Sequence, residues 1–168
     1  MNMDFLIKAA LSDTLISSLQ RTNVYVKDIP DIRKQPFKSA FKTKLSHIEQ
    51  EYANPVANDK HIQNIQSFAG SLSQEFSDIL QDEHLRLGVA QKGVNLFLKF
   101  LWSFDKIPEP PHCPIDAIVL GAINSKILWT KLDDVQIYEE IIAECKRVAR
   151  AENISLSQWE LELWNRVA

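Results

Sequence analysis

Residues 87–104 read LGVAQKGVNLFLKFLWSF, and residues 110–116 read PPHCPID. From Val94 to Phe104, apolar side chains occupy most of the circumference of a helix, which is typical of a helix buried on most sides. Four prolines lie between Asp105 and Pro114, and each disfavours helical backbone in the residue before it. The two stretches therefore predict a central buried helix followed by an extended loop.

Apolar residues recur every three or four positions along most of the remaining chain, as in amphipathic helices. This spacing predicts helices over residues 4–20 and 37–52, with irregular chain at 22–36 between them. No stretch has a convincing strand pattern. We therefore expect an all-α protein with a single compact domain over residues 1–168, composed of a helical half at 1–82 and a second half at 83–168.

Several helix ends carry recognisable capping residues. Gly70 is expected to end one helix, and Ser71 to open the next, with Gln74 completing a capping box. Ser155 and Gln158 form a second candidate capping box before a last helix that contains Trp159. Asp133 or Asp134 is expected to cap the long helix before it.

The composition is that of a soluble globular protein. Of the 168 residues, 45% are hydrophobic and 24% are charged, and the formal net charge is −3. No apolar run is long enough to cross a membrane, and the acidic residue near the N-terminus is unlike a secretion signal. The two cysteines are too few for a disulfide framework, so we expect a cytoplasmic protein.

The spacing of the histidines and cysteines indicates no metal site, whereas the spacing of several lysines suggests a surface for nucleic acid. His112 and Cys113 are adjacent, but the other histidines are scattered, so we expect no metal and no cofactor. Lys38 and Lys42, with Lys34 before them, fall four apart on one helical face that could meet phosphates. The alternative is an ordinary solvated helix surface.

The most informative combination is a lysine in the first turn of the central helix and an aspartate after the proline-rich loop. Gly88, Val89, Lys92 and Asn95 resemble the hairpin and catalytic-lysine segment of the helix-hairpin-helix DNA glycosylase superfamily, the endonuclease III-like group. Asp116, after Pro-Ile, resembles that family's catalytic aspartate. The resemblance extends from Leu87 to Arg166, and it implies a helix-hairpin-helix at 80–104.

The chain departs from the family pattern in four ways. The second hairpin glycine is Ala90, and the proline before the first glycine is Leu87. The segment between Lys92 and Asp116 is longer than in compact members, and Ala117 follows the aspartate where a threonine or arginine is common. Alanine in the hairpin weakens the close backbone approach to a DNA phosphate without preventing it.

The resemblance implies a base-excision repair glycosylase with abasic-site lyase activity on double-stranded DNA. Lys92 would attack the sugar C1′ carbon as a free amine and form a Schiff base, and Asp116 would stabilise positive charge or accept a proton. An apolar surrounding favours the uncharged amine. Gly88, Val89 and Ala90 would contact the DNA backbone.

Other interpretations of the same residues stay open. Lys92 and Asp116 could form a salt bridge, and Asp116 could simply cap a helix. The chain could then be a helical module that binds DNA or protein without catalysis, or an unrelated helical protein. Trp129 is the tryptophan expected to be most exposed, whereas Trp159 and Phe97 are expected in the core. The oligomeric state is not indicated.

Overall fold

A computed structural model describes residues 2–167, and it is helical throughout. The elements are α1 (Met3–Leu19), α2 (Asp31–Glu51), α3 (Asn58–Phe76), the 3₁₀ turn η1 (Gln81–Glu83), α4 (Leu87–Ser103), α5 (Ala117–Ala122), the 3₁₀ turn η2 (Trp129–Lys131), α6 (Val135–Ala151) and α7 (Leu156–Val167). Within residues 2–167 there is no strand, only an isolated antiparallel bridge between Tyr25 and Leu80. The all-α prediction is confirmed.

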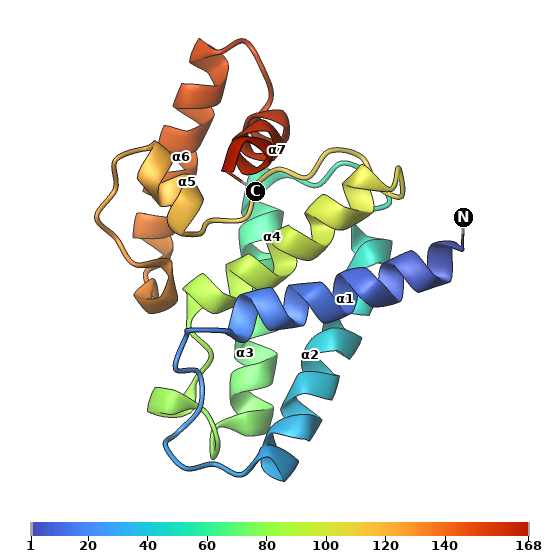
Figure 1. Cartoon of the computed structure of the whole chain (residues 1–168), viewed down its shortest axis with the longest axis vertical. Helices are drawn as coiled ribbons and strands as arrows, with labels where there is room; N and C mark the ends of the chain where they lie inside the picture. The colour runs from blue at the N-terminus through green and yellow to red at the C-terminus, as the bar shows by residue number, and fades with distance from the viewer. Residues whose placement is uncertain (1, 168) are drawn as a thin grey trace.

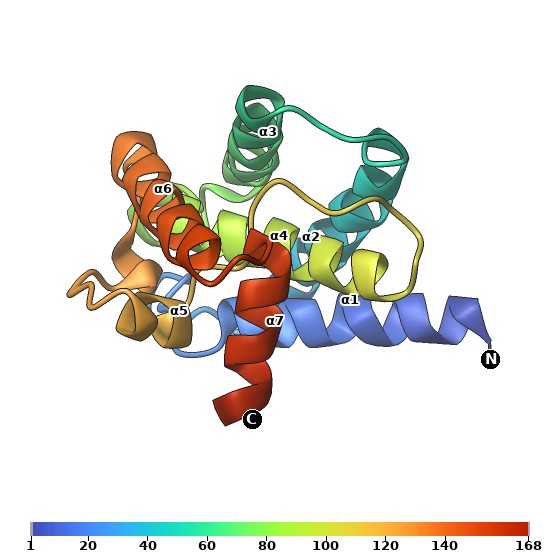
Figure 2. The same ribbon diagram turned by 90° about the horizontal axis from the view of Figure 1, so that it is seen from above.

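Helix α4 is the centre of the molecule. α1 lies along one side of α4 and α3 lies on the opposite side (Figures 1 and 2). α6 and α7 pack together, and α5 contacts α7 (Figure 1). Val94, Phe97, Leu98 and Leu101 of α4 are fully buried. The predicted central helix therefore exists, and it begins at Leu87.

Helix α2 begins earlier than the sequence predicted. It starts at Asp31, and Pro36 lies inside it. Pro36 is the sixth residue of the helix, so α2 lacks the hydrogen bond that an N–H at this position would donate to the Ile32 carbonyl. Phe37, Phe41 and Leu45 on the same helix are fully buried, so the packing of this apolar face stabilises the helix despite the proline.

The predicted break at Gly70 is wrong, because α3 continues through it to Phe76. Gly70 does not adopt the positive φ that ends many helices. The hydroxyl of Ser71 donates to the Phe68 carbonyl, and that of Ser73 donates to the Ala69 carbonyl. Both serines therefore bond back within the helix instead of capping a new one.

The other predicted caps are present. Asp134 accepts a hydrogen bond from the backbone N–H of Ile137 and so caps α6. Ser155 and Gln158 make the two reciprocal bonds of a capping box at the start of α7. No helix among residues 2–167 is long and apolar enough to cross a bilayer.

Residues 80–104 contain one α-helix, not two joined by a hairpin. The element before α4 is the three-residue η1, in which Asp82 and Glu83 have positive φ angles of 57° and 61°. Leu80, just before η1, forms the bridge with Tyr25. The chain therefore enters α4 through a tight turn, and the preceding α-helix is α3, which ends at Phe76.

At the start of α4, the backbone of Trp129 lies so close to Gly88 that only glycine fits there. A Cβ atom at this position would lie 1.8 Å from the Trp129 carbonyl oxygen, and the Gly88 N–H donates to the Leu132 carbonyl at 2.7 Å. We expect Gly88→Ala to lower the free energy of unfolding by about 3 kcal/mol, because backbone cannot move aside as a side chain can. Urea denaturation measures this change.

Gly70→Ala is the matched control for this substitution. A Cβ atom at Gly70 meets nothing within 4 Å, and the residue is helical. Alanine there should raise the free energy of unfolding by up to about 1 kcal/mol, through helix propensity. Equal effects of the two substitutions would show that the contact between Gly88 and Trp129 does not constrain the fold.

Candidate active site

Lys92 and Asp116 form a buried ion pair between α4 and the N-terminus of α5. Lys92 Nζ donates to Asp116 Oδ2 at 2.6 Å, and the two side chains are only 9% and 13% exposed. The other carboxylate oxygen, Oδ1, accepts the backbone N–H groups of Ile118 and Val119 at 3.0 and 3.1 Å. Asp116 is therefore both a helix cap and the partner of Lys92, one oxygen for each role.

Gln91 fixes the distance between the two chain segments that carry this pair. Its Nε2 donates to the Ile115 carbonyl at 2.7 Å, and its Oε1 accepts the Ile115 N–H at 3.0 Å. Gln91 immediately precedes Lys92, and Ile115 immediately precedes Asp116. Because both Gln91 and Ile115 are fully buried, this paired contact holds the lysine and the aspartate opposite each other.

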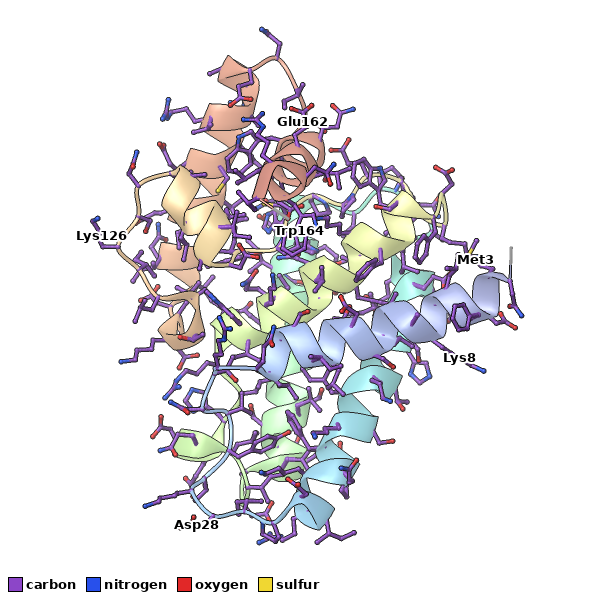
Figure 3. The ribbon with its side chains drawn as sticks, viewed as in Figure 1. Met3, Lys8, Asp28, Lys126, Glu162 and Trp164 are labelled. Atoms are coloured by element: carbon purple, nitrogen blue, oxygen red, sulfur yellow. The ribbon has the colours of Figure 1, made fainter. Side chains whose placement is uncertain are left out.

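Two clefts meet at the ion pair. The first, called here the α1/α7 cleft, has a volume of about 330 Å³ and is lined by residues of α1, α4 and α7 together with Asp116. The second, the α5-loop cleft, has a volume of about 520 Å³ and is lined partly by the loop Ile127–Thr130. Lys92, Asp116 and Trp164 line both clefts. Figure 3 places the Trp164 side chain between α7 and α4.

A second amine–carboxylate pair lines the α1/α7 cleft. Lys99 Nζ lies 2.7 Å from Glu160 Oε2, and 5.5 Å from the centroid of the Trp164 ring. Burial raises the pKa of Glu160, and the neighbouring Lys99 opposes that rise only in part. Lys92 and Lys99 are seven residues apart on α4, which places them on one face of the helix. The pairing of Lys99 with Glu160 could not be predicted from the sequence, because the two residues are 61 positions apart.

The predicted DNA-contacting residues at the start of α4 are all buried. The N–H of Gly88 donates to Leu132, and those of Val89 and Ala90 both donate to the Arg86 carbonyl at 3.1 Å. These three amides therefore have partners inside the protein, and none is free to bind a phosphate. They form the buried first turn of α4, the helix that carries Lys92.

The predicted lysine stripe lies apart from the ion pair. Lys38 and Lys42 are half-buried on α2, and neither lines the two clefts. Among the tryptophans, Trp129 is half-buried on the α5-loop cleft, whereas Trp164 is 44% exposed. The expectation that Trp129 is the most exposed was wrong, while Trp159 lies in the core as predicted.

A chain of buried hydrogen bonds runs along the opposite side of α4. The Tyr52 hydroxyl donates to His61 Nδ1, and His61 Nε2 donates to Asn95 Oδ1 at 2.8 Å. Asn95 Nδ2 donates to the Tyr138 hydroxyl at 3.1 Å, which in turn donates to His112 Nδ1 at 2.7 Å. This assignment of donors satisfies every link when both histidines are neutral with the proton on Nε2.

The two neutral histidines make the fold sensitive to acid. Burial lowers the pKa of His61 to about 4 and that of His112 to about 2. In the unfolded chain both histidines have a pKa of about 6.5. Below that pH the unfolded state binds more protons, so stability falls as the pH decreases.

We expect protonation of these two histidines to lower the free energy of unfolding by about 3 kcal/mol between about pH 6.5 and about pH 5. His84, whose pKa is raised by hydrogen bonds to Asp82 and Asp133, offsets part of this loss. Urea denaturation over this pH range measures it. A flat profile would contradict the assignment of two buried neutral histidines.

Metal chemistry has no candidate centre in the described part of the chain. Among residues 2–167, no three His, Cys, Asp or Glu side chains cluster as metal ligands would. His112 is held by hydrogen bonds to Tyr138 and Asn58. Cys113 is buried, and its pKa is raised by a hydrogen bond with Cys145 and by burial, which makes it a poor nucleophile.

Comparisons with protein-family models, with curated proteins and with solved structures found no match to this chain. The function must therefore be argued from the site itself.

Proposed function

We propose that the chain acts on DNA as a glycosylase with abasic-site lyase activity, with Lys92 as the nucleophile. The observation that carries this proposal is the 2.6 Å contact of Lys92 with Asp116 at the junction of two clefts. An amine beside a carboxylate, mostly shielded from water but open to a cavity, is suited to covalent attack on an electrophilic carbon. The resemblance of Lys92, Asn95 and Asp116, in their sequence contexts, to the catalytic segments of endonuclease III-like glycosylases supports the same assignment, although the hairpin of that family is not formed at residues 80–104.

The chemistry begins with a proton transfer. The ammonium of Lys92 gives a proton to Asp116 Oδ2, its hydrogen-bond acceptor. The free amine then adds to C1′ of the ring-opened abasic sugar, and loss of water gives an imine. Asp116 returns its proton to the departing hydroxyl as water leaves, and as a carboxylate it can then accept a proton from C2′ while the C3′–O bond breaks and the 3′ phosphate ester departs. Water then hydrolyses the imine and frees Lys92. On an intact nucleotide, the amine instead displaces the base from C1′, the base takes up a proton as it leaves, and opening of the C1′–O4′ bond of the sugar gives the same imine.

The α5-loop cleft is better suited than the start of α4 to receive the DNA backbone. Arg21 lines this cleft, and Lys126 and Lys131 flank the loop that forms its wall. None of the three forms an ion pair within residues 2–167. Unpaired cations beside a cleft attract phosphates even though the net charge is −3.

Borohydride trapping tests the proposal. The protein is incubated with duplex DNA carrying an abasic site or an oxidised base, and sodium borohydride reduces any imine to a stable adduct. We expect a covalent adduct with abasic duplex DNA and none with the same duplex lacking the lesion. Absence of an adduct with every substrate, together with retained DNA binding, would instead indicate a helical binding module that uses no covalent step.

A further inference from the structure

A third cavity lies between α3 and α6 and shares no lining residue with the two clefts at Lys92. Its volume is about 370 Å³, and its polar lining residues are Asn58, His112, Glu139, Lys146 and Arg150. In Figure 2, α3 is on the opposite side of α4 from α1. This cavity is called here the α3/α6 pocket, and the proposed lyase chemistry does not use it.

Two cations face this pocket without a carboxylate partner. Lys146 and Arg150 are four residues apart on α6, so they lie on one face of the helix. Within residues 2–167 neither side chain forms an ion pair, whereas Arg147, between them, pairs with Glu144. Burial and the charge of Arg150 lower the pKa of Lys146. The two like charges therefore repel each other, and an anion between them would remove that repulsion.

Hydrogen bonds orient a further donor, the side chain of Asn58, which is an exposed residue on the α3 side of the pocket. Asn58 Oδ1 accepts from His112 Nε2 at 2.6 Å and from Lys146 Nζ at 3.3 Å. The Nδ2 group of Asn58 remains available as a donor, because within residues 2–167 it has no hydrogen-bond partner. Asn58 is also the first residue of α3, and its N-cap, Ala57, provides no side-chain acceptor. The uncapped end of this long helix adds partial positive charge at the pocket, which Asp59 in the first turn of α3 offsets in part.

From this arrangement we infer that the α3/α6 pocket binds the phosphoryl group of a small phosphorylated molecule. Lys146, Arg150 and the Asn58 amide donate to the phosphoryl oxygens, as charge-assisted hydrogen bonds commonly do. Glu139 is the one carboxylate that lines the pocket within the described chain. It opposes the binding of an anion, so its charge limits the affinity of the site.

Calorimetric titration of the whole chain tests the inference with three probes: inorganic phosphate, deoxyadenosine 5′-monophosphate and deoxyadenosine. We expect the two phosphorylated probes to bind and the nucleoside not to bind. Tighter binding of the monophosphate indicates a phosphate ester as the ligand, and equal binding indicates that the phosphoryl group alone is recognised. No binding of either phosphorylated probe overturns the inference.

Variants assign the binding to this pocket. Lys146→Gln and Arg150→Gln should each weaken the binding of phosphate about tenfold, because each removes a charged donor. Lys146→Arg should retain binding, and Glu139→Gln should strengthen it. Arg147→Gln is the matched control, because it removes one positive charge from the same helix outside the pocket. Equal weakening by Arg147→Gln and Lys146→Gln, in variants with unchanged circular dichroism, would place the binding elsewhere and contradict the inference.

Discussion

Lys92→Ala is expected to eliminate the borohydride-trapped adduct and to lower the lyase rate by at least about a thousandfold. The reason is that the substitution removes the only amine that lies within hydrogen-bond distance of Asp116 in the described chain. DNA binding should change much less, because the Lys92 charge is already neutralised by its partner. Gel quantification of adduct formation against time measures the rate.

Lys99→Ala is the matched control, because Lys99 is a partly buried lysine that is also paired with a carboxylate and lines the α1/α7 cleft. Lys99 lies opposite Glu160, not Asp116, so its removal should leave the adduct. If both alanine variants lose the adduct equally, loss of cleft structure explains the result. If Lys99→Ala alone loses it, the nucleophile has been assigned to the wrong lysine.

Asp116→Asn is expected to lower the lyase rate by about a hundredfold or more while the fold is retained. Asparagine is as good a helix cap as aspartate, so the hydrogen bonds to Ile118 and Val119 can persist. What the substitution removes is the carboxylate that accepts the Lys92 proton. Single-turnover kinetics on abasic duplex DNA measures the chemical step separately from binding.

Asp116→Ala separates the two roles of this residue in stability. Both substitutions leave the Lys92 ammonium without its carboxylate, at a cost of about 3 kcal/mol for a mostly buried pair. Alanine should cost about 1 kcal/mol more than asparagine, because it also removes the cap of α5. A full lyase rate in Asp116→Asn would contradict the role of Asp116 as the acceptor of the Lys92 proton and leave it a structural role only.

The helices could be predicted from the sequence because their apolar spacing is local information. The central helix, predicted from Val94 to Phe104 and observed as Leu87–Ser103, depends on residues only a few positions apart. The same holds for the cap at Asp134 and the capping box at Ser155. The early start of α2 and the continuity of α3 through Gly70 could not be predicted in this way. In both cases buried side chains, such as Phe37 and Leu72, outweigh the local preference of a proline or a glycine.

The candidate site was only partly predictable. Lys92 and Asp116 were selected as a pair because they lie in the context of a known motif, and they do meet. Gln91, Glu160 and Trp164 were not selected, because their roles depend on contacts between segments distant in the sequence. Lys99 and Glu160, for example, are 61 positions apart. No local pattern specifies which side chains such packing brings together.

The sequence motif at Gly88–Ala90 predicted backbone contacts with DNA, but in the structure these N–H groups have partners inside the protein. The motif suggested that small residues expose backbone N–H groups to a ligand. Instead, the lack of a side chain at Gly88 leaves room for the Trp129 carbonyl. The N–H of Gly88 donates to the Leu132 carbonyl. The same glycine serves close packing within the protein, a requirement that the sequence pattern alone cannot distinguish from ligand contact.

The most direct test of the central claim is to locate the trapped adduct on the chain. The borohydride-reduced complex with abasic duplex DNA is digested with protease and nuclease, and the modified residue is identified by tandem mass spectrometry. The account predicts a sugar remnant on Lys92 and an unmodified Lys99. A remnant on Lys99, on the N-terminal amine or on scattered surface lysines would contradict the assignment of Lys92 as the nucleophile.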